Sequence, residues 1–319
     1  MTKNMITVKN LIKRYKKATF NAVDDISFDV KEGEFFTFLG PNGAGKTTTI
    51  SILTTTLSKT SGQVSIAGYD IDKNSSLVRQ SVGIIFQNPS LDLNLTAEEN
   101  IRFHSILYGI YPFAPSFNLM SSEYKKRVNE LSQIIGLGKD IFKPIKTFSG
   151  GMKRKLEIIR SLMHKPKVLF LDEPTIGLDP LSRKSLWEYL TMVRKQEKTT
   201  IFLTTHYLDE AENADRVCII NQGKIIMIGT PDKIKKSLID EYLLIDAKDR
   251  NKLEVELKKM KLHYEIDGHF KIHVKDGNSI QKIIHSIETP LITLKTHSPT
   301  LEEAYLEIIG QNKKEANAS

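Results

Sequence analysis

A phosphate-binding loop constrains the fold of this chain more than any other segment. Residues 40–47 match a glycine, four residues of any type, and then Gly-Lys-Thr. This pattern is meaningful where a strand ends at the loop and a helix starts from it. The apolar run Phe35–Leu39 precedes the loop, and residues 47–57 suit a helix. The segment therefore predicts an α/β domain in which a buried strand leads into an anion-binding turn.

The chemistry of this loop follows from its residue types. Its glycines let successive backbone N–H groups turn toward phosphates without Cβ clashes, and the helix adds the positive end of its dipole. Lys46 brings a mobile positive charge, and the Thr47 hydroxyl is placed to coordinate Mg²⁺. The residues expected to bind the nucleotide here are Gly40, Pro41, Asn42, Gly43, Ala44, Gly45, Lys46, Thr47 and Thr48.

Two carboxylates follow a second apolar run, at residues 168–171. In open parallel sheets, ligands gather at the C-terminal ends of the strands. Asp172 is suited to hold Mg²⁺ through water, and Glu173 is suited to orient the attacking water or accept its proton. The alternative is a solvated strand end that carries two acids. The phosphate loop earlier in the chain favours the catalytic interpretation.

A pair of glycines lies upstream of this strand, in the segment Phe-Ser-Gly-Gly-Met at 148–152. Ser149 can cap the helix that follows, and Gly150 and Gly151 allow a phosphate to approach the backbone closely. The alternative is a plain Gly-Gly turn before an amphipathic helix. The position of the segment between the other two motifs favours a role in nucleotide binding.

With these motifs in this order, residues 5 to about 232 resemble the nucleotide-binding subunit of an ABC transporter. The resemblance implies a P-loop ATPase core with a parallel sheet, an antiparallel β subdomain and a helical insert. It also implies that two copies of the chain, or a copy and a paralogue, close on two ATP molecules with Mg²⁺. In that arrangement the Ser149–Gly151 segment contacts nucleotide held by the other subunit.

Three more residues gain a role from the resemblance alone. Tyr15 matches the aromatic residue that stacks on adenine, Gln87 matches the glutamine that contacts Mg²⁺ or water, and His206 matches the histidine that hydrogen-bonds the γ-phosphate. The expected catalytic residues are Lys46, Gln87, Glu173 and His206, and the expected metal ligands are Thr47, Gln87 and Asp172.

The resemblance also points to a branch of the family. Phe148 and Met152 replace the commoner leucine and glutamine of the signature, as in subunits that serve drug and antibiotic exporters. Residues 298–305 are similar to the C-terminal extension of that branch. The implied partners are a second nucleotide-binding subunit and separate membrane permease subunits. The chain would then lie in the cytoplasm, bound to the inner face of the membrane through the permease.

The chain of 319 residues suits two domains. We expect the ATPase domain at 1–232, with its helical insert at about 88–165. Residues 233–310 follow the pattern strand-helix-strand-strand-helix-strand, which predicts a small ferredoxin-like α+β domain. Residues 311–319 are polar and are predicted to form a disordered tail. A strand is expected over 65–69.

Composition leaves the choice of partner open. The net charge of +8 is spread along the chain, which favours solvated basic faces over one nucleic-acid surface. A soluble ABC-type ATPase acting on nucleic acid or ribosomes is the alternative function, and a nucleotide binder without turnover is a third. No apolar run approaches the length of a membrane span, the N-terminus lacks an apolar signal core, and the single cysteine, Cys218, is expected to be buried.

Overall fold

The computed structural model describes residues 3–87, 90–238, 241–274, 277–297 and 300–307. The chain divides into two compact units, Met1–Ile228 and Gly229–Ser319. The tail predicted at 311–319 lies outside the described residues. In the part of the chain that is described, none of the helices combines the length and the hydrophobicity needed to cross a bilayer.

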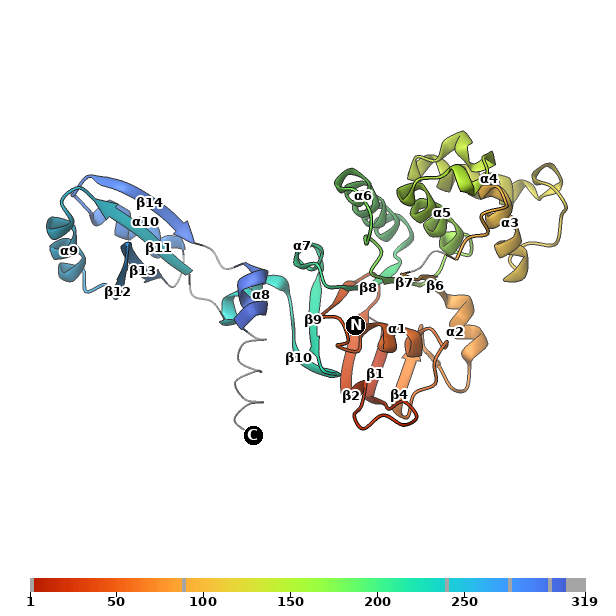
Figure 1. Ribbon diagram of the computed structural model, residues 1–319, viewed down its shortest axis with the longest axis horizontal. Helices are drawn as coiled ribbons and strands as arrows, with labels where there is room; N and C mark the ends of the chain where they lie inside the picture. Colours follow the sequence, from red (N-terminus) through yellow and green to blue (C-terminus); the bar gives the residue numbers. More distant parts are fainter. Residues whose placement is uncertain (1–2, 88–89, 239–240, 275–276, 298–299, 308–319) are drawn as a thin grey trace. The chain divides into compact units, whose positions relative to one another are not determined.

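The first unit is built on a six-stranded sheet with the order β10-β9-β3-β8-β7-β6 (Figure 1). From β9 to β6, each strand runs parallel to its neighbour. The strands are β3 (Phe35–Leu39), β6 (Val82–Ile85), β7 (Val168–Asp172), β8 (Thr200–Thr205), β9 (Arg216–Asn221) and β10 (Lys224–Gly229). All residues of β3, β7 and β8 are buried, as expected for parallel strands covered on both faces. This confirms the predicted fold class.

An antiparallel sheet with the order β2-β1-β4-β5 forms a second layer of this unit. Its strands are β1 (Asn4–Lys13), β2 (Val23–Lys31), β4 (Ser61–Ile66) and β5 (Tyr69–Asp70). Phe28 of β2 lies 5.6 Å from Phe36 and 5.5 Å from Phe38 of β3, ring centroid to ring centroid. Helix α1 (Lys46–Leu53) follows the phosphate loop, and its Ile50 and Ile52 are buried in the same core.

The prediction of one strand over 65–69 is wrong. The chain reverses at Ala67 and Gly68, where φ is 52° and 88°, and β5 then pairs antiparallel with β4. Two successive residues with positive φ are typical of a tight hairpin turn. The apolar run that suggested one strand therefore contains a turn.

Helices α3, α4 and α5 form a layer beside the β6 edge of the parallel sheet (Figure 1). The layer consists of α3 (Ala97–Leu107), α4 (Ser122–Ile135) and α5 (Gly150–Leu162). Short 3₁₀ turns lie at Phe117–Leu119, Gly138–Phe142 and Ile145–Thr147. Helix α2 (Ser75–Ser81) precedes β6. Helix α3 begins with a capping box formed by Thr96 and Glu99. Glu99 N donates to Thr96 Oγ1 at 3.2 Å, and Thr96 N donates to Glu99 Oε2 at 2.7 Å.

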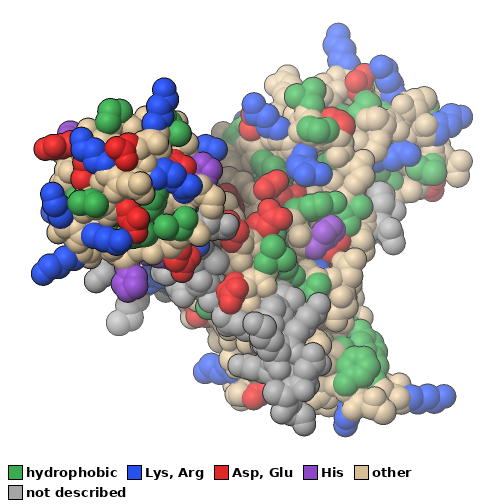
Figure 2. All heavy atoms as spheres, turned by 60° about the vertical axis from the view of Figure 1, so that its left-hand side comes forward, with side chains coloured by type: hydrophobic (Ala, Val, Ile, Leu, Met, Phe, Trp, Pro, Cys, Tyr) green, Lys and Arg blue, Asp and Glu red, His purple; other side chains and the backbone are tan. Residues whose placement is uncertain are grey.

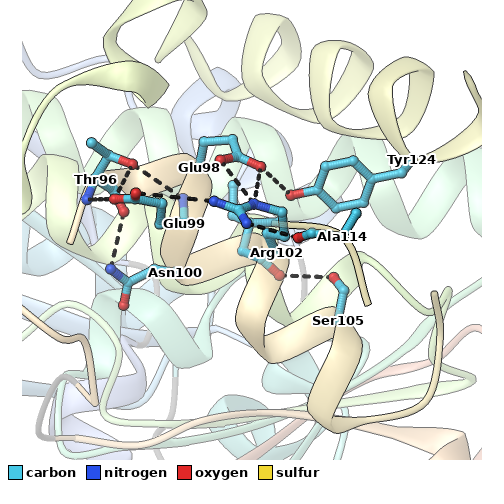
Figure 3. A network of polar contacts seen from close by, with 9 residues as sticks. Thr96, Glu98, Glu99, Asn100, Arg102, Ser105, Ala114 and Tyr124 are labelled. Carbon is cyan, nitrogen blue, oxygen red and sulfur yellow. Dashed lines mark hydrogen bonds and ion pairs between the residues drawn. The ribbon is translucent and has the colours of Figure 1, made fainter. Parts of the chain in front are cut away.

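A buried ion pair holds this helical layer together (Figure 3). Arg102 Nε lies 3.1 Å from Glu98 Oε1, and each residue is 3% exposed. Arg102 Nη1 donates to the Ala114 carbonyl at 2.9 Å, and the Tyr124 hydroxyl of α4 donates to Glu98 Oε1 at 3.0 Å. Burial and the neighbouring Glu98 raise the pKa of Tyr124. The pair thus connects α3, α4 and the loop between them through satisfied hydrogen bonds.

Helices α6 (Pro180–Glu197) and α7 (Leu208–Ala211) complete the first unit. Asp179 caps α6 by accepting from Ser182 N at 2.9 Å. The indole of Trp187 on α6 stacks on Phe35 of β3 with ring centroids 5.7 Å apart. This contact holds α6 against the sheet near the start of β3.

The second unit contains a four-stranded antiparallel sheet with the order β12-β13-β11-β14. Its elements are α8 (Pro231–Leu238), β11 (Glu241–Ala247), α9 (Arg250–Lys259), β12 (Tyr264–Asp267), β13 (His269–Val274), α10 (Gly277–Ser286) and β14 (Leu291–His297), followed by helical residues 301–307. Leu243, Leu253 and Phe270 belong to its core. The succession of elements and the strand order are those of the predicted ferredoxin-like fold.

Candidate active site

A cavity of about 640 Å³ opens at the phosphate loop, between the end of β3 and the start of α1. Two glycines of the loop have no room for a side chain. A Cβ on Gly45, where φ is 105°, would lie 2.5 Å from the Ala22 carbonyl oxygen. A Cβ on Gly40 would lie 2.2 Å from the Ile220 carbonyl oxygen. The loop therefore reaches this shape because its glycines pack directly against neighbouring backbone.

Lys46 is 5% exposed, and its ammonium group is surrounded by oxygen atoms. Its Nζ donates to the carbonyls of Gly40 at 2.7 Å and Pro41 at 3.1 Å, and lies 3.3 Å from Glu173 Oε1. These contacts stabilise a buried positive charge at the loop. Oxygens of a bound triphosphate would be stronger partners for the same charge, because they carry full negative charge.

Thr47 and Asp172 bring together a hydroxyl and a carboxylate from separate elements. Thr47 Oγ1 lies 3.4 Å from Asp172 Oδ1, which also accepts from Thr204 Oγ1 at 2.5 Å. Burial raises the pKa of Asp172, and the hydrogen bonds from Thr204 and Thr47 act in the opposite direction. A hydroxyl and a carboxylate fit Mg²⁺, which prefers oxygen ligands and takes others from phosphates and water.

Glu173 follows β7 with φ of 46°, an unfavourable value for a residue with a side chain. Its N–H is held by Thr204, with the carbonyl at 3.1 Å and Oγ1 at 3.2 Å. The side chain turns toward Lys46 and His206, whose Nδ1 lies 3.3 Å from Glu173 Oε1. One carboxylate oxygen is thus shared by a cation from the phosphate loop and an imidazole that follows β8. The cavity is lined by Glu173 and by the two residues whose catalytic roles were expected from the resemblance alone, His206 and Gln87.

Tyr15, the residue expected to stack on adenine, is not among the residues that line the cavity, whereas Phe20 is. The Tyr15 hydroxyl lies 3.2 Å from Thr48 Oγ1, and the side chain is 46% exposed. Phe20 lines the cavity and is 71% exposed, a high value for an aromatic ring. Sequence reasoning missed Phe20. The signal available was a second aromatic residue in the loop between β1 and β2.

The Ser-Gly-Gly segment forms the N-terminus of α5. Ser149 Oγ accepts from Met152 N at 3.2 Å, so the predicted cap is present. A Cβ on Gly151 would lie 2.6 Å from Ser182 Oγ, whereas a Cβ on Gly150 would meet open space. The described lining of the cavity at the phosphate loop comes from other parts of the chain. Within one chain, the described segment therefore does not line the cavity.

Glu210 of α7 is a third buried carboxylate near the site, after Asp172 and Glu173, and sequence reasoning missed it. It accepts hydrogen bonds from Thr205 at 2.6 Å and from Thr175, and it is 2% exposed. Burial raises the pKa of Glu210, and the two threonine hydroxyls oppose this shift. Glu210 therefore joins the loop after β7 to the end of β8, directly before His206.

The chain is similar to known proteins in sequence and in structure. A family model described as "ABC transporter" matches residues 23–176. The linearmycin resistance ATP-binding protein LnrL of Bacillus subtilis is 35% identical, over 98% of this chain and 100% of that protein. The bacitracin transport ATP-binding protein BcrA of Bacillus licheniformis is 33% identical, over 96% of this chain and 97% of that protein. A dimeric ATP-binding cassette in a post-hydrolysis state with ADP and phosphate is 26% identical, with a TM-score of 0.63, over 71% of this chain and 98% of that one.

Proposed function

The chain belongs to the ABC transporter family as an ATP-binding subunit with ATPase activity, and from that premise we propose that it drives export through separate permease subunits. The observation that carries the catalytic part is the convergence of Lys46 and His206 on one carboxylate oxygen of Glu173, within the cavity. Export is supported by similarity along nearly the whole chain to proteins named for linearmycin resistance and bacitracin transport.

In the proposed reaction, water attacks the γ-phosphorus of ATP bound at the phosphate loop, the bond from this phosphorus to the β–γ bridging oxygen breaks, and ADP and phosphate are released. Glu173 orients this water or accepts its proton, and His206 donates a hydrogen bond to the γ-phosphate. Lys46 neutralises negative charge on the phosphates. Thr47 and Asp172 would hold Mg²⁺ with Gln87 nearby, and the metal would supply further charge neutralisation. ATP and Mg²⁺ are thus the proposed substrate and cofactor.

The second half of each site is proposed to come from another copy of the chain. Ser149, Gly150 and Gly151 would present the N-terminus of α5 to the nucleotide of the partner, where backbone N–H groups attract phosphate. This is supported by the separation of the segment from the cavity of its own chain. It is supported also by the dimeric cassette among similar structures.

The permease is proposed to dock on the helical layer. Large apolar side chains of this layer are exposed, and exposed apolar surface is available for binding another protein. They are Leu93, Phe103, Leu107, Phe113, Leu119 and Phe142. Gln87 lies on the segment that enters this layer, so movement of the layer would reach the cavity. The subunit would then work at the cytoplasmic face of the membrane.

A nucleic-acid partner finds less support. On the face shown in Figure 2, Lys and Arg side chains lie interspersed with Asp and Glu. Binding to the phosphates of nucleic acid is favoured by a continuous basic surface. We therefore retain the exporter over the soluble ATPase acting on nucleic acid or ribosomes.

The substitution Glu173→Gln tests the proposed chemistry. We expect ATP binding to be retained, turnover to fall by about 100-fold or more, and an ATP-bound dimer to accumulate on gel filtration. Glu188→Gln is the matched control, because Glu188 is an exposed residue of α6. Turnover of Glu173→Gln at the wild-type rate would contradict the proposed role, and co-purification with nucleic acid in place of a membrane protein would contradict the exporter.

A further inference from the structure

Arg154, on the first turns of α5, holds two other segments of the same chain. Its side chain is buried, with 6% of the residue exposed. Nε donates to the Pro174 carbonyl at 2.8 Å, and Nη2 donates to the Glu173 carbonyl at 3.4 Å. Nη1 donates to the Phe86 carbonyl at 2.6 Å, directly before Gln87. One guanidinium group thus connects α5, the turn after β7 and the segment that carries Gln87.

A buried carboxylate on the same helix fixes this guanidinium. Glu157 Oε2 lies 2.9 Å from Arg154 Nη1, and Glu157 is 1% exposed. Glu157 Oε1 accepts from Ser90 N at 3.0 Å. Arg154 and Glu157 neutralise each other's charge. The other hydrogen bonds of both side chains go to backbone groups, and a buried ion pair needs such partners to be stable. Phe86 and Ser90 flank Gln87, so α5 holds the chain on both sides of it.

The turn that Arg154 contacts is the one that needs external support. Glu173 has φ of 46°, and such a conformation persists in a residue with a side chain only where the surroundings hold it. Thr204 holds the N–H side of Glu173, and Arg154 holds the carbonyl side. The direction of the Glu173 side chain therefore depends on both contacts.

We propose that Arg154 is a positioning residue that sets the Glu173 carboxylate against the Gln87 segment of its own chain. The inference rests on the proposed catalytic role of Glu173 and on the proposed dimer. Helix α5 presents Ser149–Gly151 to the nucleotide of the partner and, one turn later, holds the turn of its own Glu173. Binding of the partner's ATP to α5 is thereby transmitted to the catalytic carboxylate of the chain that owns the helix. Lysine cannot replace this arginine, because its single nitrogen does not bridge separate carbonyls in a plane.

The first test compares Arg154→Lys with Arg160→Lys in the full-length chain. Arg160 lies on the same helix and donates to the Ser90 carbonyl at 2.6 Å. This contact is with the chain after Gln87 and not with the turn that carries Glu173. For Arg154→Lys we expect kcat to fall by about 10- to 100-fold, with ATP affinity and ATP-dependent dimerisation unchanged. Arg160→Lys keeps its kcat. Should Arg154→Lys fold poorly, the pair Arg154→Gln with Glu157→Gln removes both buried charges and is expected to show the same loss of kcat.

Mixed dimers show which site Arg154 serves. In one, an Arg154→Lys chain pairs with a Glu173→Gln chain, so the intact Glu173 lies in the chain with the altered helix. In the other, both substitutions lie in one chain and the partner is wild type. We expect the first dimer to lose turnover and the second to match a dimer of wild type with Glu173→Gln.

Three results would overturn the inference alone: loss in the second dimer instead of the first, wild-type kcat in Arg154→Lys, or an equal loss in Arg160→Lys. Absence of turnover in the wild-type dimer would instead refute the proposed function, and this inference with it.

Discussion

Protonation of a half-buried histidine should destabilise the helical layer at mildly acidic pH. The ring of His104 on α3 stacks on Tyr108 with centroids 4.2 Å apart, and Tyr108 lies 6.1 Å from His164, which follows α5. Burial lowers the pKa of His104 to about 3, and the positive charges of Arg160 and His164 add to this effect. Burial also lowers the pKa of His164. The hydrogen bond to the Val82 carbonyl raises this pKa, and the positive charge of Arg127 lowers it. His104 is therefore neutral in the folded chain near pH 7.

The size of the effect follows from the difference in proton binding between the two states. Unfolded His104 takes up a proton as the pH falls through 6.5, whereas folded His104 resists protonation until about pH 3. The stability that neutral His104 contributes is complete above pH 6.5 and is lost progressively below it. From pH 7.5 to 5.5 this loss amounts to about 1.4 kcal/mol in the free energy of unfolding. The pKa of His164 is lowered as well, so protonation of His164 in the unfolded chain adds to this loss of stability.

The assay uses the single tryptophan of the chain, Trp187, which lies in the first unit. Urea unfolding is followed by its fluorescence at pH 7.5 and 5.5, for wild type and for His104→Phe, which keeps an aromatic ring but does not titrate. Wild type should lose about 1.4 kcal/mol more than the variant between the two pH values. His285→Phe, at an exposed position of the second unit, is the control and should follow wild type. Equal losses in wild type and His104→Phe would refute the reasoning.

Two further predictions concern packing and nucleotide binding. Arg102→Ala should lower the free energy of unfolding by about 3–5 kcal/mol, because Glu98 is left buried without its partner; urea unfolding that shows a stability near wild type would contradict this. Phe20→Ala should weaken ATP binding by roughly 2- to 10-fold while leaving affinity for inorganic triphosphate unchanged, since an aromatic ring that lines the cavity would stack on the adenine base, which triphosphate lacks. Tyr15→Phe is the matched control: it keeps its ring, loses only the hydroxyl contact with Thr48, and should bind ATP like wild type. Wild-type ATP affinity in Phe20→Ala would contradict stacking of adenine on Phe20.

Those parts of the structure that depend on local patterns could be predicted from the sequence. The buried strands β3 and β7 are continuous apolar runs, and the Thr96 cap lies three residues before its glutamate. The fold of the second unit followed from the order of its elements. The turn at Ala67 was missed because nothing in an alanine signals positive φ.

The polar contacts that support the site could not be predicted in the same way. Arg154 stands in the run Lys-Arg-Lys, which resembles a solvated basic segment, and yet it is buried. Its partner Phe86 is 68 residues away in the sequence. Glu210 lies among other acidic residues of a short helix, and only the fold brings it to Thr175. Pairings of this kind arise from the tertiary arrangement, which a local pattern does not encode.

The central claim is that each site is completed by the signature segment of the other subunit. It is tested most directly by ATP turnover in two mixed dimers that contain Ser149→Arg, whose long side chain would occupy the space of the partner's phosphates. When a Ser149→Arg chain pairs with a Glu173→Gln chain, the intact Glu173 works with an intact Ser149 from its partner, and turnover should persist. When one chain carries both substitutions and the other is wild type, turnover should be lost. The opposite pattern, with loss in the first dimer and activity in the second, would contradict the account.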